Sequence, residues 1–139
     1  MDIPKCPVYK KCSGCQLQNL SYSQQLDHKQ AMSIGILGDY CHVSPITGMY
    51  YPLHYRNKIS AVFAENRGKA VCGVWQSSSK KIVQNDGCMI EDKISSETIK
   101  DICDIVNQLD IPAFNRYSWT GFLRHVLVRR GFKTGQVLV

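Results

Sequence analysis

The chain has 139 residues, of which 44% are hydrophobic and 20% are charged, and its net charge is +6. This length fits a single domain, and no segment approaches the roughly 20 apolar residues that a membrane-spanning helix needs. The N-terminus shows no basic and apolar export signal, so we expect a cytoplasmic protein with no membrane partner. We also expect it to be monomeric.

The first structural feature along the chain is a group of three cysteines, Cys6, Cys12 and Cys15. Gly14 relieves the tight turn between the last two, and the lysines nearby favour thiolates. The chain contains seven cysteines, and without an export signal such a group favours metal binding over disulfides. Thiolates suit zinc or an iron–sulfur cluster, and both usually require four ligands.

The first helix is predicted to follow directly. Ser21 and Gln24 have the spacing of a capping box, and Gly38 supplies a stop signal, so we expect a helix from Tyr22 to Leu37. Pro and Gly residues then mark a loop.

Two strands and a second helix come next. Residues 59–63 and 70–75 are expected to form a hairpin around the Gly-containing loop 65–69, and Ile82-Val83 reads as a short third strand. The second helix is indicated by apolar residues at helical spacing, with Ser95 as its cap and Ile94 packed onto Ile99 as a staple.

The chain is expected to close with a hairpin of residues 123–129 and 136–139 around the loop 131–135. The pattern predicts an α+β fold: a mostly antiparallel sheet, two helices and an N-terminal Cys-rich loop that binds a cluster. We assign residues 1–22 to the cluster-binding segment and residues 23–139 to an α+β domain that contacts RNA. Because the chain stops within an apolar strand, it reads as part of a longer protein.

Four further cysteines could supply the fourth ligand. Cys103 lies on the apolar side of the second helix and Cys72 lies within a strand, where packing is their ordinary role. Cys41 follows the first helix and stays an alternative. Cys88 lies in the turn-rich loop 85–88, from which a side chain is free to reach a cluster, so it is the best choice.

Charge is distributed unevenly along the chain. Residues 42–81 and 113–139 are basic, whereas residues 82–112 are acidic. Solvated surface explains most charge runs, but two basic segments also suit a protein with one face for a polyanion such as nucleic acid.

Four blocks, in order, resemble the RNA uracil-C5 methyltransferases, the family of the 23S rRNA 5-methyluridine enzymes. They read CPVYKKCSGCQLQNLSYSQQLDHK, HYRNKISAVF, CGVWQSSSKKIVQNDGC and GFLRHVLVRRGFKTGQVLV. The resemblance implies a structural [4Fe–4S] cluster ligated by Cys6, Cys12, Cys15 and Cys88. It also implies S-adenosylmethionine as the methyl donor of the full-length enzyme and a Cys thiolate that attacks C6 of a flipped-out uracil.

The cofactor-binding part of that family is not recognisable in this chain. We find no Gly-rich cofactor loop, no Asp-Pro-Pro-Arg stretch and no cysteine that matches the nucleophile. We therefore expect the S-adenosylmethionine-dependent domain to lie downstream, and we expect these 139 residues to be inactive alone.

Five basic residues beside or within the predicted strands are the candidates for contact with rRNA: Arg56, Lys58, Arg124, His125 and Arg129. Ordinary exposed charge is the simpler explanation, but with the resemblance we expect them to meet phosphates. Three aromatic residues could stack on bases: Tyr55, Trp75 and Trp119. The alternative function is a stand-alone RNA-binding module that carries zinc or an iron–sulfur cluster and has no catalytic activity.

Overall fold

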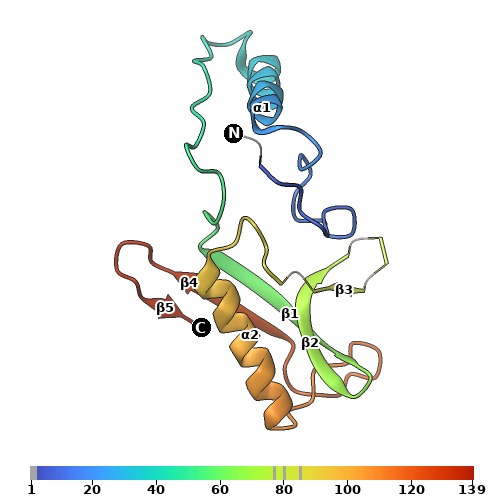
Figure 1. Cartoon of the computed structure of the whole chain (residues 1–139). Helices are drawn as coiled ribbons and strands as arrows, with labels where there is room; N and C mark the ends of the chain where they lie inside the picture. The colour runs from blue at the N-terminus through green and yellow to red at the C-terminus, as the bar shows by residue number, and fades with distance from the viewer. Residues whose placement is uncertain (1–2, 77, 80, 85) are drawn as a thin grey trace.

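The computed structural model describes residues 3–76, 78–79, 81–84 and 86–139. The first two residues of the predicted segment 1–22, and Asn85 of the loop before Cys88, lie outside the described residues. The elements in chain order are α1 (Tyr22–Leu37), β1 (Lys58–Asn66), β2 (Lys69–Trp75), β3 (Ile82–Val83), α2 (Lys93–Gln108), β4 (His125–Arg130) and β5 (Val137–Leu138). The described residues thus form two helices and one sheet, which confirms the predicted α+β class (Figure 1).

The sheet is antiparallel throughout, with the strand order β3-β2-β1-β4-β5. β1 pairs with its neighbour β2 through a turn of two residues, Arg67 and Gly68, whose φ angles are 53° and 76°. Positive φ at both positions is what a tight hairpin turn requires, because it matches the twist of the flanking strands. The strands are therefore longer, and the loop shorter, than the sequence predicts.

One face of the sheet is covered by α2 (Figure 1). The core consists of alternate residues of β1 and β4 together with residues of α2 and the loop that follows it: Ile59, Ala61, Phe63, Val126, Val128, Ile99, Val106 and Ala113. Phe63 and Val128 are essentially inaccessible to solvent. Burying each large side chain of this kind contributes about 1.5–3 kcal/mol, so the sheet and α2 form the stable body of the molecule.

The start of α2 differs from the sequence prediction. Its N-cap is Asp92, whose Oδ2 accepts hydrogen bonds from the backbone N–H of Ser95 at 3.0 Å and from the Ser95 hydroxyl at 2.9 Å. Ser95 was therefore wrongly predicted as the cap, and it lies buried inside the first turn. Ile94, expected to staple the helix onto Ile99, is 41% exposed.

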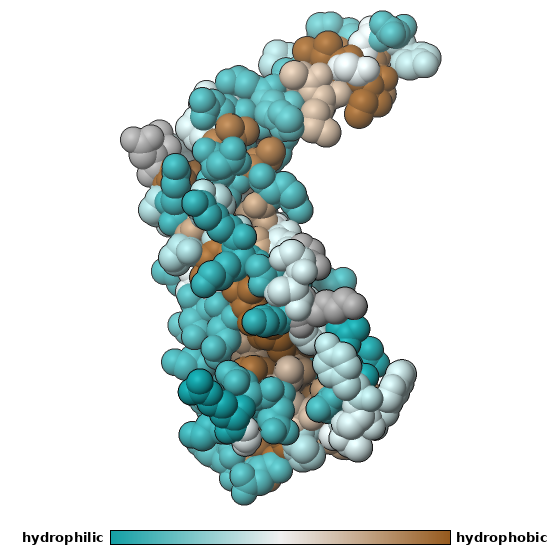
Figure 2. Space-filling model, turned by 90° about the vertical axis from the view of Figure 1, so that its right-hand side faces the viewer, coloured by the Kyte–Doolittle hydropathy of each residue, from teal (hydrophilic) through white to brown (hydrophobic). Residues whose placement is uncertain are grey.

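The helix α1 has the predicted bounds and the predicted capping box, in which Ser21 and Gln24 exchange hydrogen bonds of 2.9 Å and 3.3 Å. None of the residues of α1 is buried, and the helix stands away from the sheet (Figure 1). It is tied to the segment that returns toward β1, since the hydroxyl of Tyr22 accepts the N–H of Met49 at 2.6 Å. Figure 2 shows apolar side chains open to solvent at this end of the molecule.

The helices of the described residues are all too short or too polar to span a membrane.

Candidate metal centre and nucleic-acid interface

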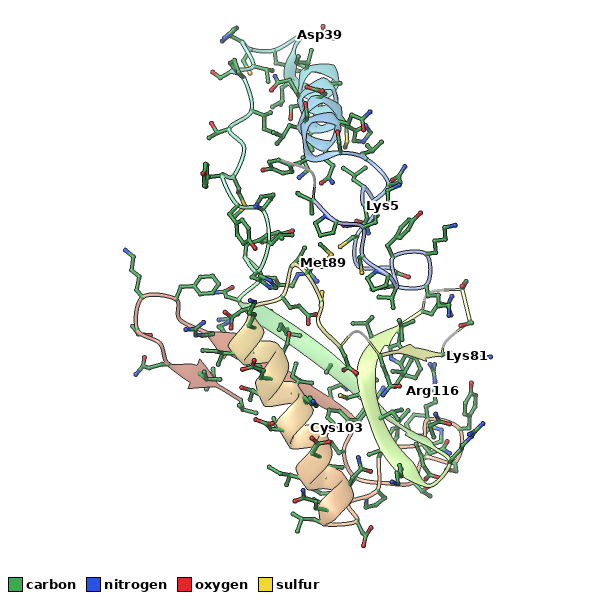
Figure 3. The ribbon with its side chains drawn as sticks, viewed as in Figure 1. Lys5, Asp39, Lys81, Met89, Cys103 and Arg116 are labelled. Carbon is green, nitrogen blue, oxygen red and sulfur yellow. The ribbon has the colours of Figure 1, made fainter. Side chains whose placement is uncertain are left out.

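Four cysteines meet between the N-terminal segment and the loop that precedes α2. Cys6, Cys12, Cys15 and Cys88 are all half-buried and all line one small cavity of about 40 Å³. Figure 3 shows sulfur atoms gathered at this junction, beside the loop that carries Met89. The structure therefore places the three clustered cysteines with the one loop cysteine that the sequence favours.

The backbone around the first three cysteines is tightly turned. The N–H of Cys12 donates to the carbonyl of Val8 at 2.7 Å, and the N–H of Gly14 lies 3.4 Å from the Sγ of Cys12. A Cβ at position 14 would come within 3.3 Å of that sulfur. Glycine thus leaves room for the sulfur of Cys12 and lets a backbone N–H face it.

The thiols influence one another electrostatically. Burial raises the pKa of Cys15, and the neighbouring sulfurs of Cys88, Cys12 and Cys6 raise it further, while the positive charge of Arg56 acts in the opposite direction. Burial likewise raises the pKa of Cys88, although hydrogen bonding to the backbone of Ile90 opposes that change. Ionising several of these thiols together is unfavourable unless a cation lies among them, so any metal bound there would displace protons from the thiols.

Among the described residues, no three His, Cys, Asp or Glu side chains are grouped closely enough to hold a metal ion. The four cysteines share a cavity without forming a ready-made ion site. As a donor set, four thiolates suit either zinc or an iron–sulfur cluster.

The remaining cysteines occupy ordinary positions. Cys72 and Cys103 pack against the hydrophobic core, as the sequence predicts. Burial, together with the neighbouring Cys103, raises the pKa of Cys72 to about 12. Cys41 is exposed just after α1.

The cavity lined by the four cysteines, which we call the thiol cavity, is joined to the sheet by the loop 88–92. The segment that returns from α1 runs beside this loop: the N–H of His54 donates to the carbonyl of Met89 at 2.9 Å, and the N–H of Arg56 donates to that of Ile90 at 2.8 Å. The N–H of Asp92 in turn donates to the carbonyl of Arg56 at 3.0 Å. Arg56, predicted to contact RNA, is exposed and is also close enough to Cys15 to affect its pKa.

Three of the predicted RNA-binding residues lie together on the sheet face that α2 leaves open. In the pairing of β1 with β4, Lys58 lies opposite Arg129 and Val62 lies opposite His125. Directly opposed residues project from the same face, and their neighbours in the strands form the core on the other face. Lys58, His125 and Arg129 are exposed. Like charges placed directly opposite each other are destabilising. A bound anion would therefore reduce the repulsion between Lys58 and Arg129.

Arg124 lies next to this face, with its guanidinium carbon 5.2 Å from the centre of the Phe114 ring. Sequence reasoning missed Arg116, whose guanidinium carbon lies 5.4 Å from the Trp75 ring centre and 5.9 Å from that of Tyr117. The signal that could have found it is its place in a C-terminal segment with basic residues and no acidic ones. Its stacking partner on β2 is remote in sequence.

The other two predicted aromatic residues are both accessible. Trp119 is 77% exposed and packs edge-on against Phe114, with ring centres 6.1 Å apart. Tyr55 is exposed near the thiol cavity, where it lines the same depression as Cys15.

No protein-family model matches the chain. Curated relatives include an uncharacterized RNA methyltransferase of Clostridium acetobutylicum, 36% identical over 98% of this chain and 31% of the relative. Another, of Oceanobacillus iheyensis, is 37% identical over 98% of this chain and 30% of the relative. Among solved structures, the tRNA (uracil-54, C5)-methyltransferase of Pyrococcus abyssi, in complex with S-adenosyl-L-homocysteine, has a TM-score of 0.69 and 30% identity.

That solved structure is matched over 94% of this chain and 31% of its own length. These similarities confirm the predicted resemblance to the RNA uracil-C5 methyltransferases. The chain spans about 30% of the curated relatives that it matches.

Proposed function

We propose that this chain, whose relatives are RNA methyltransferases, is the metal-binding and RNA-contacting part of an enzyme that methylates C5 of a uridine in RNA. The observation that carries the proposal is the match of nearly the whole chain to part of a uracil-C5 methyltransferase. That neighbour holds S-adenosyl-L-homocysteine, which is what S-adenosylmethionine becomes when it gives up its methyl group. We therefore propose S-adenosylmethionine as the methyl donor of the whole enzyme.

The four cysteines of the thiol cavity, Cys6, Cys12, Cys15 and Cys88, are proposed to hold a [4Fe–4S] cluster. Their shared cavity, their partial burial and the N–H of Gly14 directed at one sulfur support this assignment. Methyl transfer to uracil contains no redox step, so the role of a bound cluster would be structural. It would cross-link the N-terminal segment to the loop 88–92.

The chain's own part in the reaction is to hold RNA. Attack of a thiolate on C6, transfer of the methyl group to C5 and loss of the C5 proton require a nucleophile and a cofactor pocket. We expect both in the part of the relatives that this chain does not cover. The open sheet face, with Lys58, His125 and Arg129, is proposed to bind the phosphates of the substrate.

We expect RNA binding to be salt-dependent and to involve this face. Replacing Lys58 or Arg129 with Ala should each reduce the slope of log K against log salt by about one unit or less, because each removes at most one phosphate contact. Anisotropy titrations of labelled single-stranded RNA at several salt concentrations measure this slope. Lys100→Ala, on the exposed surface of α2, should leave it unchanged. A double variant of Lys58 and Arg129 with the wild-type slope would move the RNA surface elsewhere.

Transfer of labelled methyl groups tests the function itself. We expect no incorporation by the 139 residues alone, and incorporation at C5 of a uridine by a version extended through the downstream reading frame. Offering 23S rRNA and tRNA separately decides the substrate: rRNA follows from the sequence resemblance, whereas the solved neighbour is named for tRNA. Methylation by the 139 residues alone would refute the assignment of catalysis to the part of the relatives that this chain does not cover. An extended chain that binds RNA but has no cofactor motif and no activity would favour the stand-alone binding module.

A further inference from the structure

The open face of the sheet also contains a cavity that the phosphate-binding role does not use. It lies where β2, β3 and the loop after α2 meet, and it measures about 660 Å³, within the range of about 300–1,000 Å³ that is usual for ligand sites. Apolar residues of β1 line it, among them Val62 and Ala64. Aromatic and basic side chains line it as well: Trp75, Phe114, Tyr117, Arg116 and Arg124.

The aromatic and basic residues of the cavity are already stacked on one another. The guanidinium of Arg116 lies 5.4 Å from the ring centre of Trp75, and that of Arg124 lies 5.2 Å from Phe114. Both distances are within the range of about 6 Å in which a cation is attracted to a ring face. Figure 3 shows Arg116 beside β2 and β3. The cavity therefore offers flat surfaces, both aromatic and cationic, against apolar residues.

The positive charge of this cavity is not neutralised within the described part of the chain. Among the described residues, the ion pair joins Arg130 to Asp92, on the other side of the sheet from the cavity. Neither Arg116 nor Arg124 forms an ion pair with a carboxylate of a described residue. Among the described residues that line the cavity, Glu65 is acidic, and Asn66 and Asn115 carry amides. Two guanidinium groups thus remain available to an external anion.

We propose that this cavity binds one unstacked base of single-stranded RNA, with the adjacent phosphates on Arg124 and on the neighbouring open face. The inference rests on the proposed function and extends it from phosphate contact to base contact. Every nucleobase has a flat π-face, and stacking on aromatic rings and Arg planes is how single-stranded RNA is commonly held. His125 lines the cavity and also belongs to β4, so a strand lying along Lys58 and Arg129 leads into it. Phosphate binding alone would not require the aromatic rings that line the cavity.

Replacing Arg116 with Lys separates stacking from charge. Lys keeps the positive charge but lacks the planar guanidinium, so we expect affinity for a single-stranded oligoribonucleotide to fall about five- to twentyfold, in line with the loss of one stacked base. The salt slope should stay unchanged, because no charge is removed. Arg67→Lys, in the β1–β2 turn and outside the cavity, is the matched control and should bind like the wild type.

A second measurement reports on the base directly. The chain has two tryptophans, so the Trp119→Phe variant keeps Trp75 as its one tryptophan. The fluorescence of Trp75 should change when a six-nucleotide oligouridylate binds to this variant. An abasic ribose-phosphate oligomer of the same length should bind at least fivefold more weakly and leave the fluorescence unaltered. Equal binding of the two oligomers, with Arg116→Lys also at wild-type affinity, would overturn the base-binding cavity while leaving the phosphate surface intact. No binding of either oligomer by the wild type would overturn both proposals, and tighter binding of an acidic peptide would reassign the cavity.

Discussion

Cys88→Ser is expected to abolish iron binding. Protein purified without oxygen should be brown and contain iron and sulfide, and this variant should lose most of the colour, because a cluster normally needs all four thiolates. Cys15→Ser should have the same effect, since both residues line the thiol cavity. Iron and sulfide assays, together with the visible absorption spectrum, measure the loss.

The matched control is Cys103→Ser. Cys103 is half-buried like Cys88, but it packs against the core and points its sulfur toward the carbonyl of Ala70 at 3.6 Å. The control should keep its colour, and Cys41→Ser should do so as well. Zinc in a one-to-one ratio, without iron, would refute the iron–sulfur assignment but would leave the RNA-binding proposals standing. Loss of colour in all variants alike would show that the four-cysteine assignment is wrong.

Asp92→Ala is expected to destabilise the sheet and α2 by about 3 kcal/mol, because it removes a helix cap and leaves a partly buried cation unpaired. The Oδ1 of Asp92 accepts a hydrogen bond from Nη1 of Arg130 at 2.7 Å, and in the described structure the buried Nε of Arg130 has no partner. Denaturant unfolding measures the change. Asp101→Asn, on the exposed surface of α2, should cost less than about 0.5 kcal/mol. A loss for Asp92→Ala no larger than that of the control would contradict the role given to this pair.

The same residue sets a dependence of stability on pH. Burial acts to raise the pKa of Asp92, but hydrogen bonds from Ser95 and the nearby charge of Arg130 outweigh it and hold that pKa below the ordinary value. The stabilisation is therefore fully present above the unfolded pKa of about 3.9, and it is lost as the pH falls below that value through the folded pKa. The difference in unfolding free energy between wild type and Asp92→Asn should shrink across this acidic range.

Much of the fold follows from local signals in the sequence. The capping box at Ser21 and Gln24 fixes the start of α1, and the alternation of apolar residues fixes β1, since both patterns act between near neighbours. The cap of α2 could not be read in this way. Asp and Ser are about equally good caps, and what distinguishes Asp92 is Arg130, a partner 38 residues away.

In the candidate sites, too, some features follow from near neighbours in the sequence and others depend on distant residues. That Cys88 shares a cavity with the three N-terminal cysteines could be expected from its turn-rich loop and from the strand and helix positions of Cys72 and Cys103. That Lys58 and Arg129 share a face depends on the register of β1 against β4, which the sequence of either strand alone does not specify. The contact between Arg116 and Trp75 depends on how the loop after α2 folds back over β2. Neither is a property of neighbouring residues, so sequence patterns could not reveal them.

The lack of buried residues in α1 bears on how the N-terminal third of the molecule keeps its place. Apolar burial contributes little there, so the cross-link proposed for the four cysteines would be a strong additional source of attachment. A metal held by Cys15 and Cys88 would close a loop of roughly 70 residues, whose closure entropy amounts to about 4 kcal/mol by the ln n relation. The metal would thus act on this segment as a disulfide does in a small secreted protein, by restricting the unfolded chain. Such a link would be lost when the metal dissociates, whereas a disulfide is lost when its sulfur–sulfur bond is reduced.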